Sequence, residues 1–171
     1  MPVDVPAFFA SSKSLTADLN WVVTPERHSF EAPLEVDGMS LAGARVRGTV
    51  RPGVAQPAVM LQLELISSSN RVGGLDRLDW HPIHVHDNQG KGPLHLRFVK
   101  QNYSHHHQFE LNWLETEQRL RAGNLPIAIP FEHPLSSINQ VFEFAEQYFK
   151  ISGLGRHQMP EWQEDMFRSP R

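Results

Sequence analysis

The sequence predicts an α+β fold, in which an antiparallel β-sheet is covered on one face by one main helix near the C-terminus. Two periodic segments predict it. The segment from His28 to Ser67 alternates apolar and polar residues, whereas the segment from about Ser137 to Ile151 repeats apolar residues at spacings of three and four. Strands therefore come early in the chain and the main helix comes late.

The first segment predicts a meander of three strands. Its first turn falls at Asp37-Gly38 and its second at "RPGVAQP". In the third strand, "AVMLQLELIS", the side chains of Val59, Leu61, Leu63 and Leu65 share one face. We expect this apolar face to lie against the helix.

The helix has recognisable ends. Ser137 with Gln140 three residues later forms a capping-box pattern, and Gly153 suits a left-handed C-cap. Between these two ends, the apolar residues at spacings of three and four lie on one side of the helix, and we expect this side to pack on the sheet.

Composition favours one globular domain. The chain has 171 residues, 40% hydrophobic and 20% charged, with a formal net charge of -3. We expect one domain over 1–152 and a polar tail over 153–171, from which Trp162 or Phe167 docks back. No apolar run is long enough to cross a bilayer and no basic signal-peptide start is present, so a cytoplasmic protein without a membrane partner is expected.

The absence of cysteine excludes disulfides, thiolate metal sites and cysteine nucleophiles. Histidine, carboxylate and water remain as metal ligands. Residues 70–107 hold seven of the ten histidines and carry five Lys or Arg against three Asp or Glu. This cationic middle part of an otherwise acidic chain is where we expect a site.

The stretch "DWHPIHVHDNQGKGPLHLRF", residues 79–98, predicts a histidine-rich hairpin. If its alternating apolar residues face the core, Val85 lies opposite Leu96 and Ile83 opposite Phe98. The other face of the hairpin would then gather four polar side chains: His84, His86, His95 and Arg97.

Three interpretations of this face remain open. In the first, His84, His86 and His95 bind a divalent metal, Zn, Mn, Fe or Ni, with water completing the shell. In the second, the same face performs acid–base chemistry on a phosphate-containing substrate such as RNA. That hypothesis assigns catalysis to His86, His95 and Glu110, and substrate binding to Arg97, Lys91 and Lys100.

The third interpretation is an interaction surface without catalysis, which joins a protein partner or a second copy of the chain. The pattern His84-Val85-His86 resembles the metal motif of the cupins, a family of β-barrels. The glutamate that follows in that family has no counterpart around Asn88 to Gly90, so no family is assigned.

A second histidine cluster is "SHHHQFE", residues 104–110. As a strand that continues to Trp113, it would place His105 and His107 on one face and His106 with Glu110 on the other. As a loop, its histidines could fold over the hairpin face. We further expect a loop over 67–77, a helix from Leu114 to Arg121, and an extended edge segment in "LPIAIPF".

Overall fold

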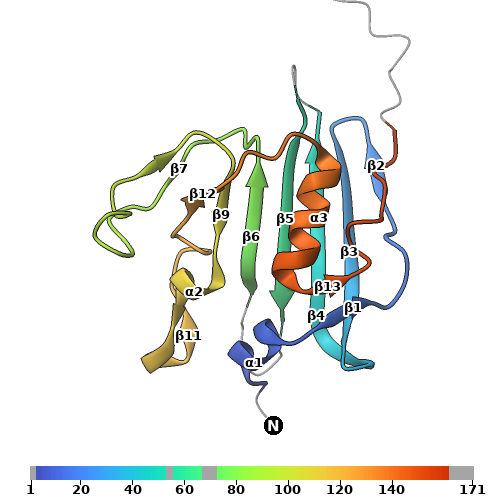
Figure 1. Ribbon diagram of the computed structural model, residues 1–171, viewed down its shortest axis with the longest axis horizontal. Helices are drawn as coiled ribbons and strands as arrows, with labels where there is room; N and C mark the ends of the chain where they lie inside the picture. The colour runs from blue at the N-terminus through green and yellow to red at the C-terminus, as the bar shows by residue number, and fades with distance from the viewer. Residues whose placement is uncertain (1–2, 53–55, 67–72, 162–171) are drawn as a thin grey trace, which may run out of the picture.

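In the computed structural model, residues 3–52, 56–66 and 73–161 are described. Figure 1 shows a twisted sheet with one long helix, α3, packed on one face and running along the central strands. The strands of this nine-stranded sheet follow the order β12-β9-β6-β5-β4-β3-β1-β13, and β2 pairs with β3. All of its pairings are antiparallel except that of β1 with β13.

The chain enters through the helix α1 (Val5–Ala10) and then builds most of the sheet before it reaches α3. The strands of the first half are β1 (Lys13–Leu15), β2 (Val22–Thr24), β3 (Arg27–Val36), β4 (Met39–Arg51), β5 (Ala58–Leu65) and β6 (Gly74–Trp80). The second half contains β7 (His86–Asp87), β8 (Lys100–Gln101), β9 (His105–His107), α2 (Phe109–Asn112), β10 (Trp113–Leu114), a 3-10 turn (Glu115–Glu117), β11 (Arg119–Leu120), β12 (Ile129–Pro130), α3 (Ile138–Phe149) and β13 (Ile151–Ser152).

The α+β prediction is confirmed, and β3, β4 and β5 form the predicted meander. The apolar side chains of β5 that were expected to share a face are all buried. The helix α3 covers this face of the sheet with Val141, Phe142, Ala145 and Phe149. Phe142 packs its ring 6.1 Å from that of Phe30, so helix and sheet share one core.

Ser137 is the N-cap of α3 as predicted, and its hydroxyl accepts a hydrogen bond from the Gln140 amide at 3.3 Å, but Gln140 Oε1 accepts from the Ser136 amide, at 2.8 Å, and not from that of Ser137. The C-terminus differs by three residues. Lys150, with φ of 55°, is the left-handed C-cap in place of Gly153. The chain reverses this early because Ile151 already pairs with Lys13 of β1.

The two faces of the sheet differ in character. Leu78 and Trp80 of β6 are buried, and the intervening Arg77 and Asp79 point to the other face. The same alternation places Arg45 and Arg47 of β4 on the face that α3 does not cover. This helix-free face carries most of the charged side chains of the central strands.

The predicted hairpin register is wrong. β7 and β8 do form a short hairpin, but His86 pairs with Gln101, and the residues assigned to the return strand lie mostly in turns. Four of the five residues predicted to face the core are exposed, Ile83 by 60%, Val85 by 59%, Leu94 by 79% and Phe98 by 80%, and the fifth, Leu96, is half-buried. The short-range alternation was misleading because β6 ends at Trp80, and His81 then turns the chain with a positive φ of 49°.

Three further local predictions are corrected. The expected loop over 67–77 is wrong from Gly74 onward, where β6 pairs with β5, and residues 67–72 lie outside the described residues. Residues 109–112 are helical, so the histidine strand stops at His107. The expected helix from Leu114 to Arg121 is a small β10–β11 hairpin around the 3-10 turn, closed by pairing of Trp113 with Leu120.

The segment "LPIAIPF" lies at the sheet edge as predicted, where β12 pairs with β9. Leu154, beyond α3, is fully buried in the core. Trp162 and Phe167 lie outside the described residues. Among the described helices, none has the length and apolar character that a membrane crossing requires.

Candidate metal centre

The site is built on the neighbouring strands β6 and β9. Their pairing sets Asp79 opposite His105 and Arg77 opposite His107, all on the helix-free face. His106 points to the opposite face, because side chains alternate along a strand. Hence the strand alternation expected for the three histidines holds, although the strand is only three residues long.

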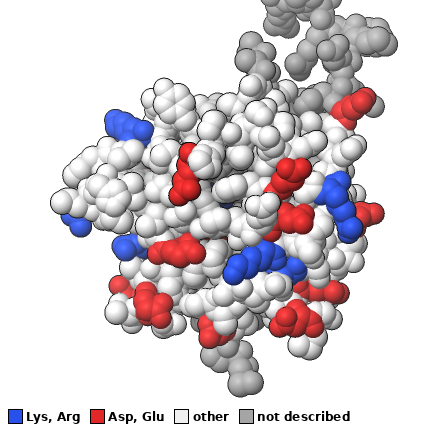
Figure 2. Space-filling view, in the orientation of Figure 1, with Lys and Arg blue, Asp and Glu red and all other residues white. Residues whose placement is uncertain are grey.

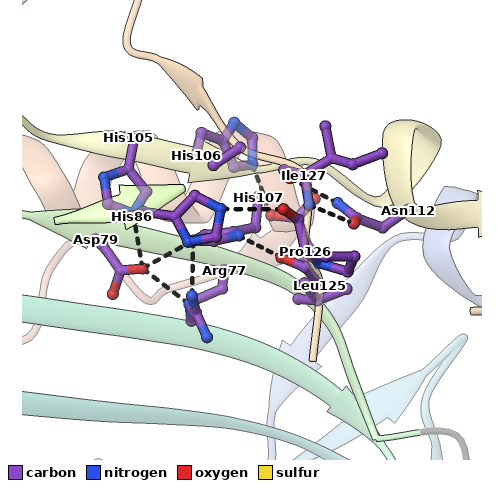
Figure 3. A network of polar contacts seen from close by, with 12 residues as sticks. Arg77, Asp79, His86, His105, His106, His107, Asn112, Leu125, Pro126 and Ile127 are labelled. Carbon is purple, nitrogen blue, oxygen red and sulfur yellow. Dashed lines mark hydrogen bonds and ion pairs between the residues drawn. The ribbon is translucent and has the colours of Figure 1, made fainter. Parts of the chain in front are cut away.

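His86 of β7 joins these residues from a separate segment. Its ring centroid lies 5.3 Å from that of His105 and 4.5 Å from that of His107, and the latter two rings are 5.0 Å apart. One ring nitrogen from each of the three histidines lies within 4.8 Å of the others. Figure 3 shows the three imidazoles gathered beside Asp79 and Arg77.

In each of the three histidines, the ring nitrogen that faces away from the cluster contacts a backbone carbonyl, and this contact orients the ring. His105 Nδ1 donates to the Tyr103 carbonyl at 2.8 Å and His107 Nδ1 to the Leu125 carbonyl at 2.6 Å. His86 Nε2 contacts the Pro126 carbonyl at 3.0 Å and Asn88 Oδ1 at 3.1 Å. A neutral imidazole has one N–H, so these contacts leave the lone pairs on His86 Nδ1, His105 Nε2 and His107 Nε2.

The carbonyls that orient two of the rings belong to one buried segment, residues 125–128. Asn112 holds this segment through Nδ2 to the Ile127 carbonyl at 2.8 Å and Oδ1 from the Ile127 amide at 3.0 Å. Asn88 does the same at Ala128, with Nδ2 to its carbonyl at 3.1 Å and Oδ1 from its amide at 2.9 Å. Both asparagines are fully buried. By holding this segment, the two asparagines also hold the carbonyl groups that orient His86 and His107.

Burial and charge set the protonation states. Burial lowers the pKa of His107 to about 4, against a partial opposing effect of the Asp79 carboxylate. Burial also lowers the pKa of His86, and the positive charge of Arg77 adds to this. For Asp79, burial favours the acid, but contacts with His105 and His107 and the charge of Arg77 outweigh it and hold the pKa below its usual range. At neutral pH, His86 and His107 are thus neutral and Asp79 is ionised.

This protonation pattern brings acceptors together. Asp79 Oδ2 lies 3.1 Å from His107 Nε2 and 3.4 Å from His105 Nε2. Arg77 supplies positive charge here, with Nε 2.8 Å from Asp79 Oδ2 and Nη2 2.7 Å from His107 Nε2. In the tautomers with Nδ1–H on His105 and His107, their Nε2 atoms and the Asp79 carboxylate are acceptors that gather around the Arg77 guanidinium, an arrangement that could also hold a metal ion.

Of the sequence-predicted metal ligands, only His86 belongs to this cluster. His84 and His95 are exposed, and no partner pairs with either ring among the described residues. Arg97 donates from Nε to the Gly92 carbonyl at 3.0 Å, and Lys91 from Nζ to the Ala122 carbonyl at 3.3 Å. Lys100 is exposed on β8.

Glu110 lies with a different group. It accepts a hydrogen bond from the Tyr148 hydroxyl of α3 at 3.2 Å. The Tyr148 ring lies 4.3 Å from that of His106, which bonds the buried Asp76 at 2.6 Å on the helix-covered face. The sheet therefore separates Glu110 from the three-histidine cluster.

A cleft of about 460 Å³ opens beside the cluster on the helix-free face. His86, His105 and Asp79 line one end, and His84 contributes to the wall. A larger cavity of about 820 Å³, near α1 and the β10–β11 hairpin, contains none of the histidines. We therefore associate function with the smaller cleft.

The chain matches no protein-family model, no curated protein and no solved structure at a significant level. The interpretation of the site consequently rests on its own geometry and chemistry.

Proposed function

We propose that this protein binds one divalent transition-metal ion through His86 Nδ1, His105 Nε2 and His107 Nε2, with Asp79 as a fourth ligand. The observation that carries the proposal is the set of outer hydrogen bonds to the Tyr103, Leu125 and Pro126 carbonyls. Such bonds on the second nitrogen fix the tautomer and orientation of metal-ligating histidines in proteins.

The distances fit a small ion. Zinc with ligands at roughly 2.0–2.2 Å in a tetrahedron places neighbouring ligand atoms about 3.4 Å apart. The two contacts from Asp79 Oδ2 to histidine nitrogens, 3.1 and 3.4 Å, already have this length. The histidine nitrogens, within 4.8 Å of one another, close the remainder by small side-chain rotations.

The donor set favours zinc among the first-row metals. Three imidazoles and one carboxylate suit Zn, and also Fe or Ni, better than the oxygen-rich shells of Mg or Ca. Arg77 must give up its contact with His107 Nε2 when the ion enters, because a guanidinium and a divalent cation repel each other. The carboxylate of Asp79 lies between the two charges and offsets this repulsion.

The test is metal binding by protein prepared without a polyhistidine tag. We expect one equivalent of zinc by elemental analysis, and a rise in the melting temperature when zinc is added to chelator-treated protein. His107→Ala should abolish both. His95→Ala is the matched control, because it removes an exposed histidine outside the cluster, and it should behave as the wild type.

Zinc that remains at one equivalent in His107→Ala, or that is lost in His95→Ala, would contradict this ligand set. His86→Ala provides a second test that spares the sheet, because β7 lies outside the main sheet.

A further inference from the structure

We infer that the cleft beside the histidines binds a phosphate ester of about nucleotide size. The inference deepens the proposed function, because one end of the cleft is the proposed metal site. Its other contacts come from arginines that do not depend on the metal.

The lining of the cleft is strongly cationic. Four arginines, Arg27, Arg47, Arg51 and Arg77, line it, and Asp79 is the single carboxylate among the lining residues. The whole chain is acidic, with a formal charge of -3. On the α3 face, Asp and Glu side chains are spread over the surface with Lys and Arg between them (Figure 2). The cleft thus gathers positive charge on a chain whose net charge is negative.

The sheet register explains this concentration. Along one row of the helix-free face, Arg47 pairs with Gln62, Gln62 with Arg77, and Arg77 with His107. The neighbouring row runs through Thr49, Met60, Asp79 and His105. Since neighbouring strands lie about 4.8 Å apart, the cleft extends roughly 14 Å from β4 to the histidines on β9.

Two of the arginines lie at the far end of the cleft, and within the described part of the chain their side chains form no hydrogen bond or ion pair. His28 pairs with Val50, so the next residues, Arg27 and Arg51, adjoin each other on the same face. Both are exposed, and no carboxylate among the described residues forms an ion pair with either side chain. Arg47, in contrast, contacts Glu64 through Nε at 2.7 Å. Unpaired adjacent guanidiniums are unfavourable by themselves and favour an anionic ligand between them.

The chemistry of the cleft indicates the class of anion. Guanidinium forks match the oxygens of phosphate, and several of them together suit a group with more than one negative charge. A wall of exposed apolar side chains, Ile83 and Val85, lies along the same cleft. A volume of about 460 Å³ lies in the range of small-molecule sites, roughly 300–1,000 Å³. A phosphate attached to an organic group such as a nucleoside fits all three properties.

The experiment measures binding of two probes, ADP and a fluorescein-labelled ten-nucleotide single-stranded RNA, to the full chain with and without zinc. The double variant Arg27→Gln/Arg51→Gln removes the unpaired arginines. Arg156→Gln is the charge control, since Arg156 is exposed outside the cleft.

We expect the double variant to weaken binding at least tenfold, because hydrogen bonds to charged groups contribute about a factor of ten or more each. Arg156→Gln should leave the affinity within twofold. If the RNA is the better probe, each lost arginine should also reduce the slope of log affinity against log salt by roughly 0.7. Tighter binding of ADP identifies the ligand as a free nucleotide, and tighter binding of RNA identifies it as a chain.

Three results would overturn the inference: no binding of either probe, equal affinity in the wild type and the double variant, or displacement of both probes by equimolar sulfate. The zinc stoichiometry tests the metal proposal independently of the probes. A protein that binds zinc and neither probe refutes the cleft alone. A protein that binds a probe through Arg27 and Arg51 but takes up no zinc refutes the metal proposal alone.

Discussion

At the scale of single residues, the chemistry of the site depends on which nitrogen of each histidine is bonded. His105 and His107 donate Nδ1–H to carbonyls and present Nε2, whereas His86 donates Nε2–H and presents Nδ1. The same residue type is therefore used in two tautomers, according to which side the backbone acceptor occupies. Neutral rings are needed for this, and burial supplies that condition for His107.

Burial of His107 has a consequence for metal-free protein. Its pKa is about 4 in the folded state, below the ordinary value of 6.5, so the unfolded state binds more protons between these values. The free energy of unfolding should be largest above pH 6.5 and decrease as the pH falls towards 4. We expect a loss of about 2 kcal/mol between pH 7.5 and 5.0 from this residue.

Urea unfolding in the presence of a chelator measures this dependence. His107→Gln should reduce the loss between pH 7.5 and 5.0 by about 2 kcal/mol, leaving the smaller contribution of His86, whereas His95→Gln should retain the full loss. A flat wild-type profile would show that the ring of His107 is protonated without penalty in the folded protein.

At the scale of elements, the site joins two strands of the sheet to segments without regular structure. The strands supply Asp79, His105 and His107, and the segment over 125–128 supplies two orienting carbonyls. This segment has no neighbouring strand on that side among the described residues. Instead, asparagine side chains bond its backbone amide and carbonyl groups, as Asn112 does at Ile127. These bonds satisfy buried backbone groups that would otherwise destabilise the fold.

Asn112 is accordingly a positioning residue, and we expect Asn112→Ala to lower zinc affinity about 10–100-fold while one equivalent still binds at saturation. A competition titration against a chromophoric chelator measures the affinity. Asn102→Ala serves as the control, because Asn102 is exposed. Unchanged affinity in a folded Asn112→Ala protein would show that the segment keeps its place without this side chain.

The meander and α3 could be predicted because each follows from a local periodicity in the sequence. The site could not, because His86 reaches it through a segment whose alternation does not reflect burial, as the exposure of Ile83 and Val85 shows. Two signals did exist. Arg77-Leu78-Asp79-Trp80 alternates as a strand with one polar face, and the spacing of His105 and His107 is that of one face. The glycines before Leu75 favoured a loop, so the alternation at residues 77–80 was not interpreted as a strand. The pairing of β6 with β9 appears only in the folded structure.

At the scale of the molecule, the two faces of the sheet have different roles. One face packs on α3 and forms the core, and the other carries the arginines, Asp79 and the histidines. His106 and Asp76 are the exception, since they form a buried polar pair on the α3 side. Burial raises the pKa of Asp76, which the bond from His106 partly opposes.

The packing of α3 should determine the stability of the whole domain. Phe142 is 1% exposed and packs against both Phe30 and Trp21. We expect Phe142→Ala to lower the free energy of unfolding by about 3–5 kcal/mol through lost burial and a residual cavity.

The exposed neighbour Glu143 provides the matched control on the same helix. Glu143→Ala should change the free energy of unfolding by about 0.5 kcal/mol or less in the same urea titration. Similar effects of the two substitutions would contradict the assignment of this helix face to the core.

The parallel pair of β1 and β13 affects the order in which the molecule folds. The Ser152 hydroxyl and the Lys13 carbonyl that it bonds are 139 residues apart in sequence. Contacts of such separation form slowly, because the loop that they close loses much conformational entropy. The meander, whose contacts are local, should therefore assemble first, and β13 should add to the sheet edge in a late step. Substitutions at Ile151 would then mainly accelerate unfolding, and those at Val46 in the meander would mainly slow folding.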